Sequence, residues 1–290
     1  MTMQLEFATV DVFAAERFGG NPLAIVFGAD ALDAAAMQRI AREFALSETV
    51  FVLAPTRADA DHRLRIFTPA AELPFAGHPN VGSAFVLARR AGGARRLALE
   101  QEAGLVVADI DGDAAEIAAP QPWTRGDTVV LSRVAPCLSL PDSAIRTDRH
   151  APLRSGVGTS SLQVELATRA ALAAAAPDLA AFRRHLGDVP DARGVLAYWR
   201  ERDDLIRCRY LAPLQGIPED PATGSANAAL AGLLLSLSGG ERIAFTSIQG
   251  VEMGRPSELR LSAARDAAGA IRVRLGGRSV PVLSGTLDLG

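Results

Sequence analysis

The stretch that decides the predicted fold is Glu219-Asp220-Pro221-Ala222-Thr223-Gly224-Ser225-Ala226, followed by the apolar run 227–237. Its Pro and Gly indicate a turn, its hydroxyl residues are typical of a helix N-cap, and a helix-forming run begins at once. The run is apolar on nearly every face, which indicates a helix enclosed by other elements. We expect the first turn of this helix to offer unpaired N–H groups, so that residues 223–225 either bind a carboxylate or phosphate or only cap the helix.

The same arrangement occurs once more, upstream in the chain. Residues 65–79 contain a strand-like segment and a turn with Gly77 and His78, and an apolar run follows from Asn80. Gly77 and Gly224 are 147 residues apart, and Gln101 and Gln249, which also lie in strand-like segments, are 148 apart. Two copies of strand, loop, buried helix and strand predict two similar lobes, with two helix N-termini directed at one cleft.

The composition is that of a globular protein with two cores. The chain has 290 residues, 49% of them hydrophobic and 22% charged. Residues 119–122, Ala-Pro-Gln-Pro, are the best candidate for a linker, so we expect a first lobe at 1–122 and a second at 123–279, with the strand near 280–290 returning to the first. Many short strand patterns around two buried helices predict an α+β fold.

Several local patterns are clear enough to predict single elements. Residues 33–44 have helical spacing with one apolar face, and residues 170–186 form one helix or two broken at Pro177. A strand begins near Glu48, the first buried helix is expected at 80–90, and the chain closes with strands at 258–262, 270–275 and 279–287.

Charge and motif content exclude several classes of function. The net charge is −3, with no overall basic footprint for nucleic acid, and neither a signal sequence nor a membrane span is predicted, which favours a cytoplasmic protein. All thirty basic residues are arginine, which excludes a lysine Schiff base, and no dinucleotide-binding or Walker motif occurs. The four histidines are scattered, Cys208 is expected to be a buried thiol, and neither pattern supports a metal site. We therefore expect no cofactor and no metal.

Glu48 and His78 are the candidate reactive side chains of the first half. Glu48 opens a strand of apolar and β-branched residues, so it is either a buried carboxylate that needs a hydrogen-bond partner, an exposed residue at the strand entrance, or part of a cap with Ser47. His78 is either a proton donor or a hydrogen-bonding residue of the wall. Gly77 permits close approach of the backbone to a ligand.

Four motifs together resemble the PhzF-like phenazine-biosynthesis family over nearly the whole chain. They are residues 46–49 (Leu-Ser-Glu-Thr), 72–79 (Glu-Leu-Pro-Phe-Ala-Gly-His-Pro), 219–226 (Glu-Asp-Pro-Ala-Thr-Gly-Ser-Ala) and 249–257, which contain Gln-Gly and Met-Gly-Arg-Pro-Ser. The resemblance implies a fold shared with diaminopimelate epimerase: two pseudo-symmetric lobes, each a curled, mostly antiparallel sheet around a central helix, with the site between them and often as homodimers.

The resemblance also implies the roles of individual residues. Glu48 is the one acid and base of an isomerase that moves a proton on a small unsaturated carboxylic acid such as trans-2,3-dihydro-3-hydroxyanthranilate. His78 and Asp220 bind polar groups of the substrate and assist proton transfer, and the amides around Gly77, Gly224 and Ser225 hold its carboxylate. The related epimerases use a cysteine from each lobe, whereas Ala76 and Thr223 stand here. Racemisation by two bases is therefore not supported.

Two other functions stay open at this point. A non-catalytic protein could bind a small carboxylate with the same two loops. An amino-acid epimerase would need Thr223 or His78 to act as a base opposite Glu48.

Overall fold

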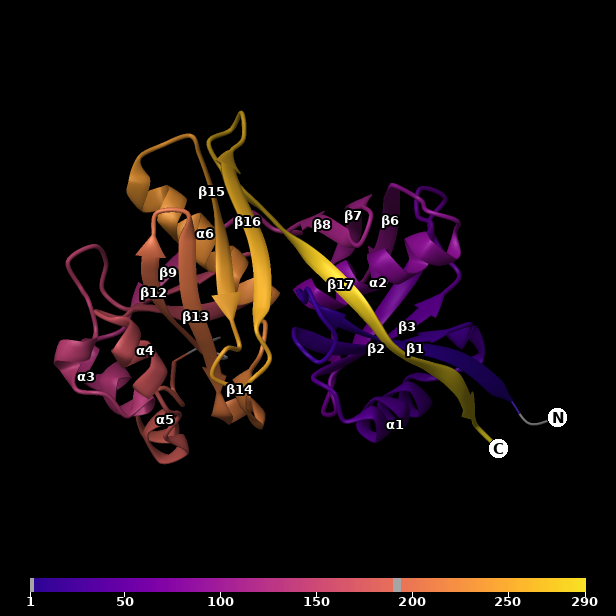
Figure 1. The fold of residues 1–290 in the computed structure, drawn as a ribbon, viewed down its shortest axis with the longest axis horizontal. Coiled ribbons are helices and arrows are strands. Elements are labelled where there is room, and N and C mark those ends of the chain that lie inside the picture. Colours follow the sequence, from indigo (N-terminus) through magenta and orange to yellow (C-terminus); the bar gives the residue numbers. More distant parts are fainter. Residues whose placement is uncertain (1–2, 190–193) are drawn as a thin grey trace. The chain divides into compact units, whose positions relative to one another are not determined.

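The computed structural model describes residues 3–189 and 194–290, and the chain divides into two compact units (Figure 1). Unit 1 comprises Met1–Pro120 and Gly276–Gly290, and unit 2 comprises Gln121–Leu275. The predicted lobes, 1–122 and 123–279, differ from these units by a few residues at each boundary.

Unit 1 is a mostly antiparallel sheet whose strand order closes on itself around one helix. Hydrogen-bonded neighbours run β1, β2, β3, β4, β6, β7, β8 and β17, and β17 pairs with β1 again. Only the pairs β2–β3 and β4–β6 are parallel among the pairs described for this unit. The elements are β1 (Gln4–Val12), β2 (Asn21–Phe27), η1 (Ala29–Ala31), α1 (Ala34–Phe44), β3 (Glu48–Leu53), β4 (His62–Phe67), β5 (Glu72–Leu73), α2 (Gly77–Arg90), β6 (Arg96–Gln101), β7 (Gly104–Asp111), β8 (Ala114–Ala118) and the end of β17 (Ile271–Asp288).

Helix α2 is the enclosed element of unit 1. It contacts β1, β2, β3, β6, β7 and β8, and most of its residues are buried (Figure 1). Helix α1 packs outside, where Met37 and Ala41 join the apolar residues of β1, β3 and β4. Asp33 caps α1, because its side chain accepts a hydrogen bond from the N–H of Ala36.

Unit 2 repeats this arrangement of strands around one buried helix, α6. Its hydrogen-bonded order is β9, β10, β11, β12, β13, β15 and β16, with β11–β12 and β13–β15 parallel. Helix α6 contacts β9, β10, β11, β15 and β16. The elements are β9 (Thr124–Thr128), α3 (Leu131–Val134), η2 (Ala135–Leu138), η3 (Asp142–Ala144), β10 (Leu153–Gly156), β11 (Ser160–Glu165), α4 (Arg169–Ala174), α5 (Leu179–His185), β12 (Val195–Arg202), β13 (Leu205–Ala212), η4 (Pro213–Gln215), β14 (Ile217–Asp220), α6 (Gly224–Ser238), β15 (Arg242–Gln249), β16 (Ser257–Arg265) and the start of β17.

The prediction of a sheet-rich fold with mixed helices and strands is confirmed, and so is the burial of the two apolar helices. Residues 170–186 form two helices, α4 and α5, on either side of Pro177, which is the second of the two predicted alternatives. The pseudo-symmetry of the two lobes stays a prediction.

Two element boundaries differ from the prediction. Helix α2 begins at Gly77 and not at residue 80, because Pro79 lies inside the first turn, where its missing N–H has no partner within the helix. The predicted break between 275 and 279 is wrong, since β17 is one continuous strand. A Cβ on Gly276 would lie 2.6 Å from the carbonyl oxygen of Ala115, so the glycine lets β17 run close to β8 without a bend.

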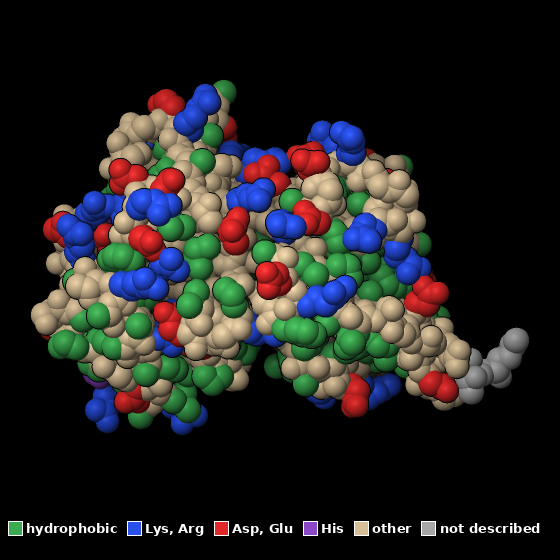
Figure 2. Space-filling view, viewed as in Figure 1, with side chains coloured by type: hydrophobic (Ala, Val, Ile, Leu, Met, Phe, Trp, Pro, Cys, Tyr) green, Lys and Arg blue, Asp and Glu red, His purple; other side chains and the backbone are tan. Residues whose placement is uncertain are grey.

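The surface carries charges of both signs. On the face shown in Figure 2, Arg side chains are interspersed with Asp and Glu. Several of the described arginines form exposed ion pairs, such as Arg57 with Asp59 and Arg278 with Asp113. No helix in the described ranges is long and apolar enough to cross a bilayer.

The close packing of α2 against the sheet gives the first testable prediction. A Cβ on Gly82 would lie 2.6 Å from Val12 Cγ2 and 2.7 Å from Leu23 Cδ2. Overpacking costs about 1–3 kcal/mol, which the better helix propensity of alanine offsets by about 1 kcal/mol. We expect Gly82→Ala to lower the free energy of unfolding in urea by up to about 2 kcal/mol. The control Gly240→Ala meets its nearest atom, Ser238 Oγ, at 3.4 Å and is expected to change stability little. A more stable Gly82→Ala variant would contradict the packing described here.

Candidate functional site

Glu48 is the first residue of β3, and its carboxylate is largely removed from water. Residue pairing between the parallel strands β2 and β3 sets Glu48 beside Leu23. The side chain is only 17% exposed, and its Oε2 atom is buried without a hydrogen bond from the described part of the chain. Burial raises the pKa of the Glu48 carboxyl to about 7, against a smaller lowering by a hydrogen bond from Ser47. Of the three alternatives, the buried carboxylate describes Glu48 best, although it stands at the strand entrance.

His78 lies opposite Glu48 in the first turn of α2. The ring is 4% exposed, and its Nε2 atom is 3.5 Å from Glu48 Oε2. Ala76 stands at the N-cap and contributes no side-chain hydrogen bond to the helix. The first amides of α2, those of Gly77 and His78, therefore lie at the positive end of a helix that no side chain caps, next to a carboxylate of raised pKa.

Asn21 and Ser47 extend this pair into a chain of polar side chains. The Asn21 side chain is fully buried, its Nδ2 lies 3.5 Å from His78 Nδ1, and its Oδ1 accepts a hydrogen bond from Ser47 Oγ at 3.1 Å. The sequence Gly19-Gly20-Asn21-Pro22 has the pattern of a turn. A buried side chain at the start of a strand cannot be told from a turn residue without the tertiary contacts.

A second polar pair holds the start of α2 to the sheet. Asn80 Nδ2 donates both to the carbonyl of Ala76 and to Gln101 Oε1, and Gln101 Nε2 returns a hydrogen bond to Asn80 Oδ1. Both side chains are buried. The pair fixes the turn that carries Gly77 and His78.

The start of α6 in unit 2 is held in the same way. Asn227 Nδ2 donates to the carbonyl of Thr223 and to Gln249 Oε1, and Gln249 Nε2 donates to the carbonyl of Asp220. The strand before each turn adds a matching ion pair, Arg65 with Glu72 in unit 1 and Arg209 with Glu219 in unit 2, each through two hydrogen bonds.

Thr223 occupies the predicted N-cap of α6 but does not cap it. Its hydroxyl donates to Asp220 Oδ2 at 2.5 Å and accepts a hydrogen bond from Gln249 Nε2 at 3.1 Å. Thr223 therefore stands at the N-cap position, but its hydroxyl oxygen accepts from Gln249 Nε2 and not from an N–H group of the helix, so the side-chain cap is absent. Gly224 is buried and Ser225 is partly buried at the first two positions of α6.

The predicted site residues thus fall into two groups. Glu48, Gly77 and His78 lie together in unit 1, and Asp220, Gly224 and Ser225 lie together in unit 2. Each group stands at the first turn of a buried helix.

The cysteines take no part in either group. Cys208 is buried, its Sγ lies 3.1 Å from Ser247 Oγ, and burial raises its pKa to about 12. Burial likewise raises the pKa of Cys137 to about 11. The prediction of a buried thiol at Cys208 is confirmed. The residues that the structure describes include no cluster of three or more His, Cys, Asp or Glu that could hold a metal ion.

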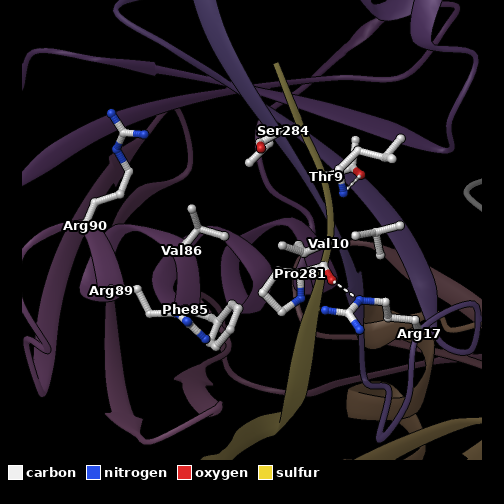
Figure 3. A pocket seen from close by; sticks show the side chains of 12 residues that line it. Thr9, Val10, Arg17, Phe85, Val86, Arg89, Arg90, Pro281 and Ser284 are labelled. Atoms are coloured by element: carbon white, nitrogen blue, oxygen red, sulfur yellow. Dashed lines mark hydrogen bonds between the residues drawn. The ribbon is translucent and has the colours of Figure 1, made fainter. Parts of the chain in front are cut away.

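A cavity of about 380 Å³ lies elsewhere in unit 1, between α2 and the strands β1 and β17 (Figure 3). Apolar residues line much of it, and Arg17, Arg89 and Arg90 border it. Arg17 Nε donates to the carbonyl of Pro281. None of the predicted site residues lines this cavity.

Comparisons with known proteins agree with this arrangement. A model of the family described as phenazine biosynthesis-like protein matches residues 10–285. An uncharacterised isomerase of Mesorhizobium japonicum is 37% identical over 295 residues, which cover 96% of each chain. A trans-2,3-dihydro-3-hydroxyanthranilate isomerase of Pseudomonas aeruginosa is 36% identical over 283 residues, covering 92% of this chain and 94% of that one. The crystal structure of a Bacillus anthracis phenazine biosynthesis protein of the PhzF family shares the fold, with a TM-score of 0.90 at 21% identity over 99% of this chain and 100% of that one.

The raised pKa of Glu48 predicts a pH dependence of stability. The folded chain still holds the Glu48 proton at pH values where the unfolded chain has released it. The contribution of Glu48 to stability is therefore complete below the unfolded value of 4.5 and is lost as the pH rises through about 7. We expect Glu48→Gln to leave the free energy of unfolding nearly unchanged at pH 4 and to raise it by up to about 3 kcal/mol at pH 8. Urea unfolding at both pH values measures this difference.

The control is Glu43→Gln, which removes an exposed carboxylate from α1 and should change stability little at either pH. An equal effect of Glu48→Gln at pH 4 and pH 8 would show that the Glu48 carboxyl titrates normally.

Proposed function

Since the chain belongs to the phenazine biosynthesis-like family and is an isomerase, we propose that it moves a proton on a small unsaturated carboxylic acid, with Glu48 as the single general acid and base. The substrate class follows the name of the Pseudomonas aeruginosa relative, a trans-2,3-dihydro-3-hydroxyanthranilate isomerase. The proposal requires no cofactor, because the carboxylate, the imidazole and the backbone amides supply the proton transfer and the charge stabilisation.

The observation that carries the proposal is the environment of Glu48. A carboxyl with a pKa of about 7 is close to evenly divided between its acid and base forms at neutral pH. It can therefore be in the ionised form that takes a proton from one carbon atom, or in the protonated form that returns a proton to another, without a large cost for reaching either form. Its position at the start of a paired strand holds it in place for both steps.

The start of α2 supplies the complementary charge. Removal of a proton next to an unsaturated carboxylic acid leaves negative charge on the substrate. The N–H groups of Gly77 and His78 lie at the positive end of a buried helix without a side-chain cap and are suited to bind this charge. His78 adds a donor beside Glu48.

We also propose that Asp220, Gly224 and Ser225 bind polar groups of the substrate. The hydrogen bond from Thr223 fixes the Asp220 carboxylate, and the first amides of α6 resemble those of α2 in lacking a side-chain cap. The matched pairs Asn80–Gln101 and Asn227–Gln249 support the proposal that the two units are copies of one pseudo-symmetric lobe. The homodimer and the cytoplasmic location stay predictions.

The two alternative functions fit less well. A non-catalytic binding protein does not agree with the assignment of the chain to the isomerases. An epimerase with Thr223 as its second base is disfavoured, because a neutral hydroxyl is a far weaker base than the carboxylate, imidazole or thiolate that abstracts a proton from carbon.

The function is tested directly by proton NMR in deuterated water with trans-2,3-dihydro-3-hydroxyanthranilate. We expect the wild-type chain to isomerise the substrate, and Glu48→Gln to lower the rate by about 10²–10⁴, the usual contribution of a general acid and base. Glu43→Gln serves as a control with the same change of charge on the surface. If the wild-type chain leaves this compound unchanged, the compound is not its substrate. If Glu48→Gln keeps full activity, Glu48 is not the general acid and base.

The pH profile gives a second test. Because Glu48 acts first as a base, the ionised carboxylate is the active form of the free enzyme. We expect kcat/KM to rise with pH and to level off above an inflection near 7. A flat profile between pH 5 and pH 9 would exclude a titrating Glu48 as the base.

A further inference from the structure

The buried side chain of Asn21 touches the candidate acid–base pair through His78. Asn21 is the first residue of β2 and is fully buried. Its Nδ2 atom lies 3.5 Å from His78 Nδ1, while the other ring nitrogen of His78, Nε2, lies 3.5 Å from Glu48 Oε2. The imidazole therefore stands between an amide on one side and a carboxylate on the other.

We propose that Asn21 is a positioning residue that fixes the tautomer of His78, with the ring proton on Nε2 and directed at Glu48. An amide nitrogen only donates hydrogen bonds, so the ring nitrogen that faces it has to accept. A neutral imidazole carries one proton, which is then on the other nitrogen. The importance of this tautomer for catalysis rests on the function proposed above, whereas the tautomer itself does not.

The Asn21 amide nitrogen faces the ring, and Ser47 contacts the other end of the amide. The Ser47 hydroxyl donates to Asn21 Oδ1 at 3.1 Å, while Nδ2 lies 3.5 Å from His78 Nδ1. Rotation of the amide by half a turn would set the oxygen against His78 Nδ1 and would favour a proton there, and the Ser47 hydroxyl would then accept from Nδ2. The proposal therefore rests on the contact between Nδ2 and the ring.

The backbone around Asn21 is held from both sides. Asn21 pairs with Val12 of β1, and the preceding Gly20 has a φ of 60°, where a Cβ would lie 2.3 Å from the carbonyl oxygen of Val12. A glycine is needed at this position, because a side chain would be strained and would collide with the strand. The turn therefore places the amide of Asn21 in a defined position next to the ring.

This tautomer gives His78 and Glu48 different roles in the reaction. With its proton on Nε2 and its Nδ1 occupied by the Asn21 amide, His78 acts as a neutral hydrogen-bond donor. It cannot give up the Nε2 proton and take another at Nδ1 without a rearrangement of Asn21. His78 then supports charge on Glu48 or on the substrate, and Glu48 alone carries the proton between carbon atoms.

Nitrogen NMR of the histidine rings tests the inference on the full chain. Long-range ¹H–¹⁵N correlation distinguishes a protonated from an unprotonated ring nitrogen, and His78→Asn identifies the signals of His78. We expect the wild-type His78 to be protonated at Nε2 only. His150 is an internal reference for a protonated Nδ1, because its Nδ1 lies 2.8 Å from the carbonyl oxygen of Ala151 and has to donate.

Two variants then change the contacts at Nδ1 of His78, where the Asn21 amide lies. In Asn21→Asp a carboxylate replaces the amide, and we expect a proton on Nδ1 of His78. In Ser47→Ala the amide oxygen loses its hydrogen bond from the hydroxyl, and we expect a mixture of the two tautomers. The signals of His62 in unit 1 and of His150 in unit 2 should stay unchanged in both variants, which checks that both units retain their fold.

The kinetic readout separates positioning from a general loss of structure. We expect Asn21→Asp to lower kcat about tenfold or more with little change in KM, because the substrate still binds while the acid–base pair is misaligned. A wild-type His78 with its proton on Nδ1, or a ring that keeps its proton on Nε2 in both variants, would overturn the inference. The tautomer is measured without substrate, so a failure of the proposed reaction does not affect this result.

Discussion

The structure depends on the enclosure of two helices that leave little of their surface to water. Helix α2 is surrounded by strands whose order closes on itself, and α6 is covered by the strands of unit 2. A helix on a surface can leave its first N–H groups to solvent, but an enclosed helix has to direct them at protein or ligand. The polar residues of each unit are accordingly gathered where its helix begins, and these are the places where the predicted site residues lie.

The same constraint explains why amides, and not charges, hold these helix starts. Asn80 with Gln101, and Asn227 with Gln249, satisfy each other and the nearby backbone without bringing net charge into the interior. A buried ion pair at these positions would be costly to remove from water and would alter the charge felt by Glu48 or Asp220. Because these amide pairs are neutral, the helix dipole and the carboxylates stay the main electrostatic features of each group.

The elements that could be predicted are those whose signals are local. The helical spacing of α1, the break at Pro177 and the apolar run of α6 each act within a few residues, and the structure contains all three. The turn with Gly77 and His78 could also be identified from the sequence. So could the carboxylate of Glu48, because a charge at the start of an apolar strand is unusual. The hydrogen bond from Thr223 to Asp220 could not be predicted. A hydroxyl at the N-cap can bond to the backbone of the helix or to a nearby side chain with similar strength, and only packing decides between them.

Contacts between distant parts of the chain were the least accessible to sequence reasoning. The closure of unit 1 by β17 requires Gly276 to pass within close range of β8, although two adjacent glycines usually indicate a turn.

Asn21 shows the same difficulty at the site itself. It precedes a proline in a glycine-rich segment and therefore has the pattern of a turn residue, yet it is buried against His78. What makes it informative is the direction of its hydrogen bonds. A hydroxyl can donate or accept and adapts to its neighbours, whereas an amide nitrogen only donates and so imposes one direction on the ring nitrogen beside it. The chemistry of Glu48 is in this way set partly by a residue that does not touch it.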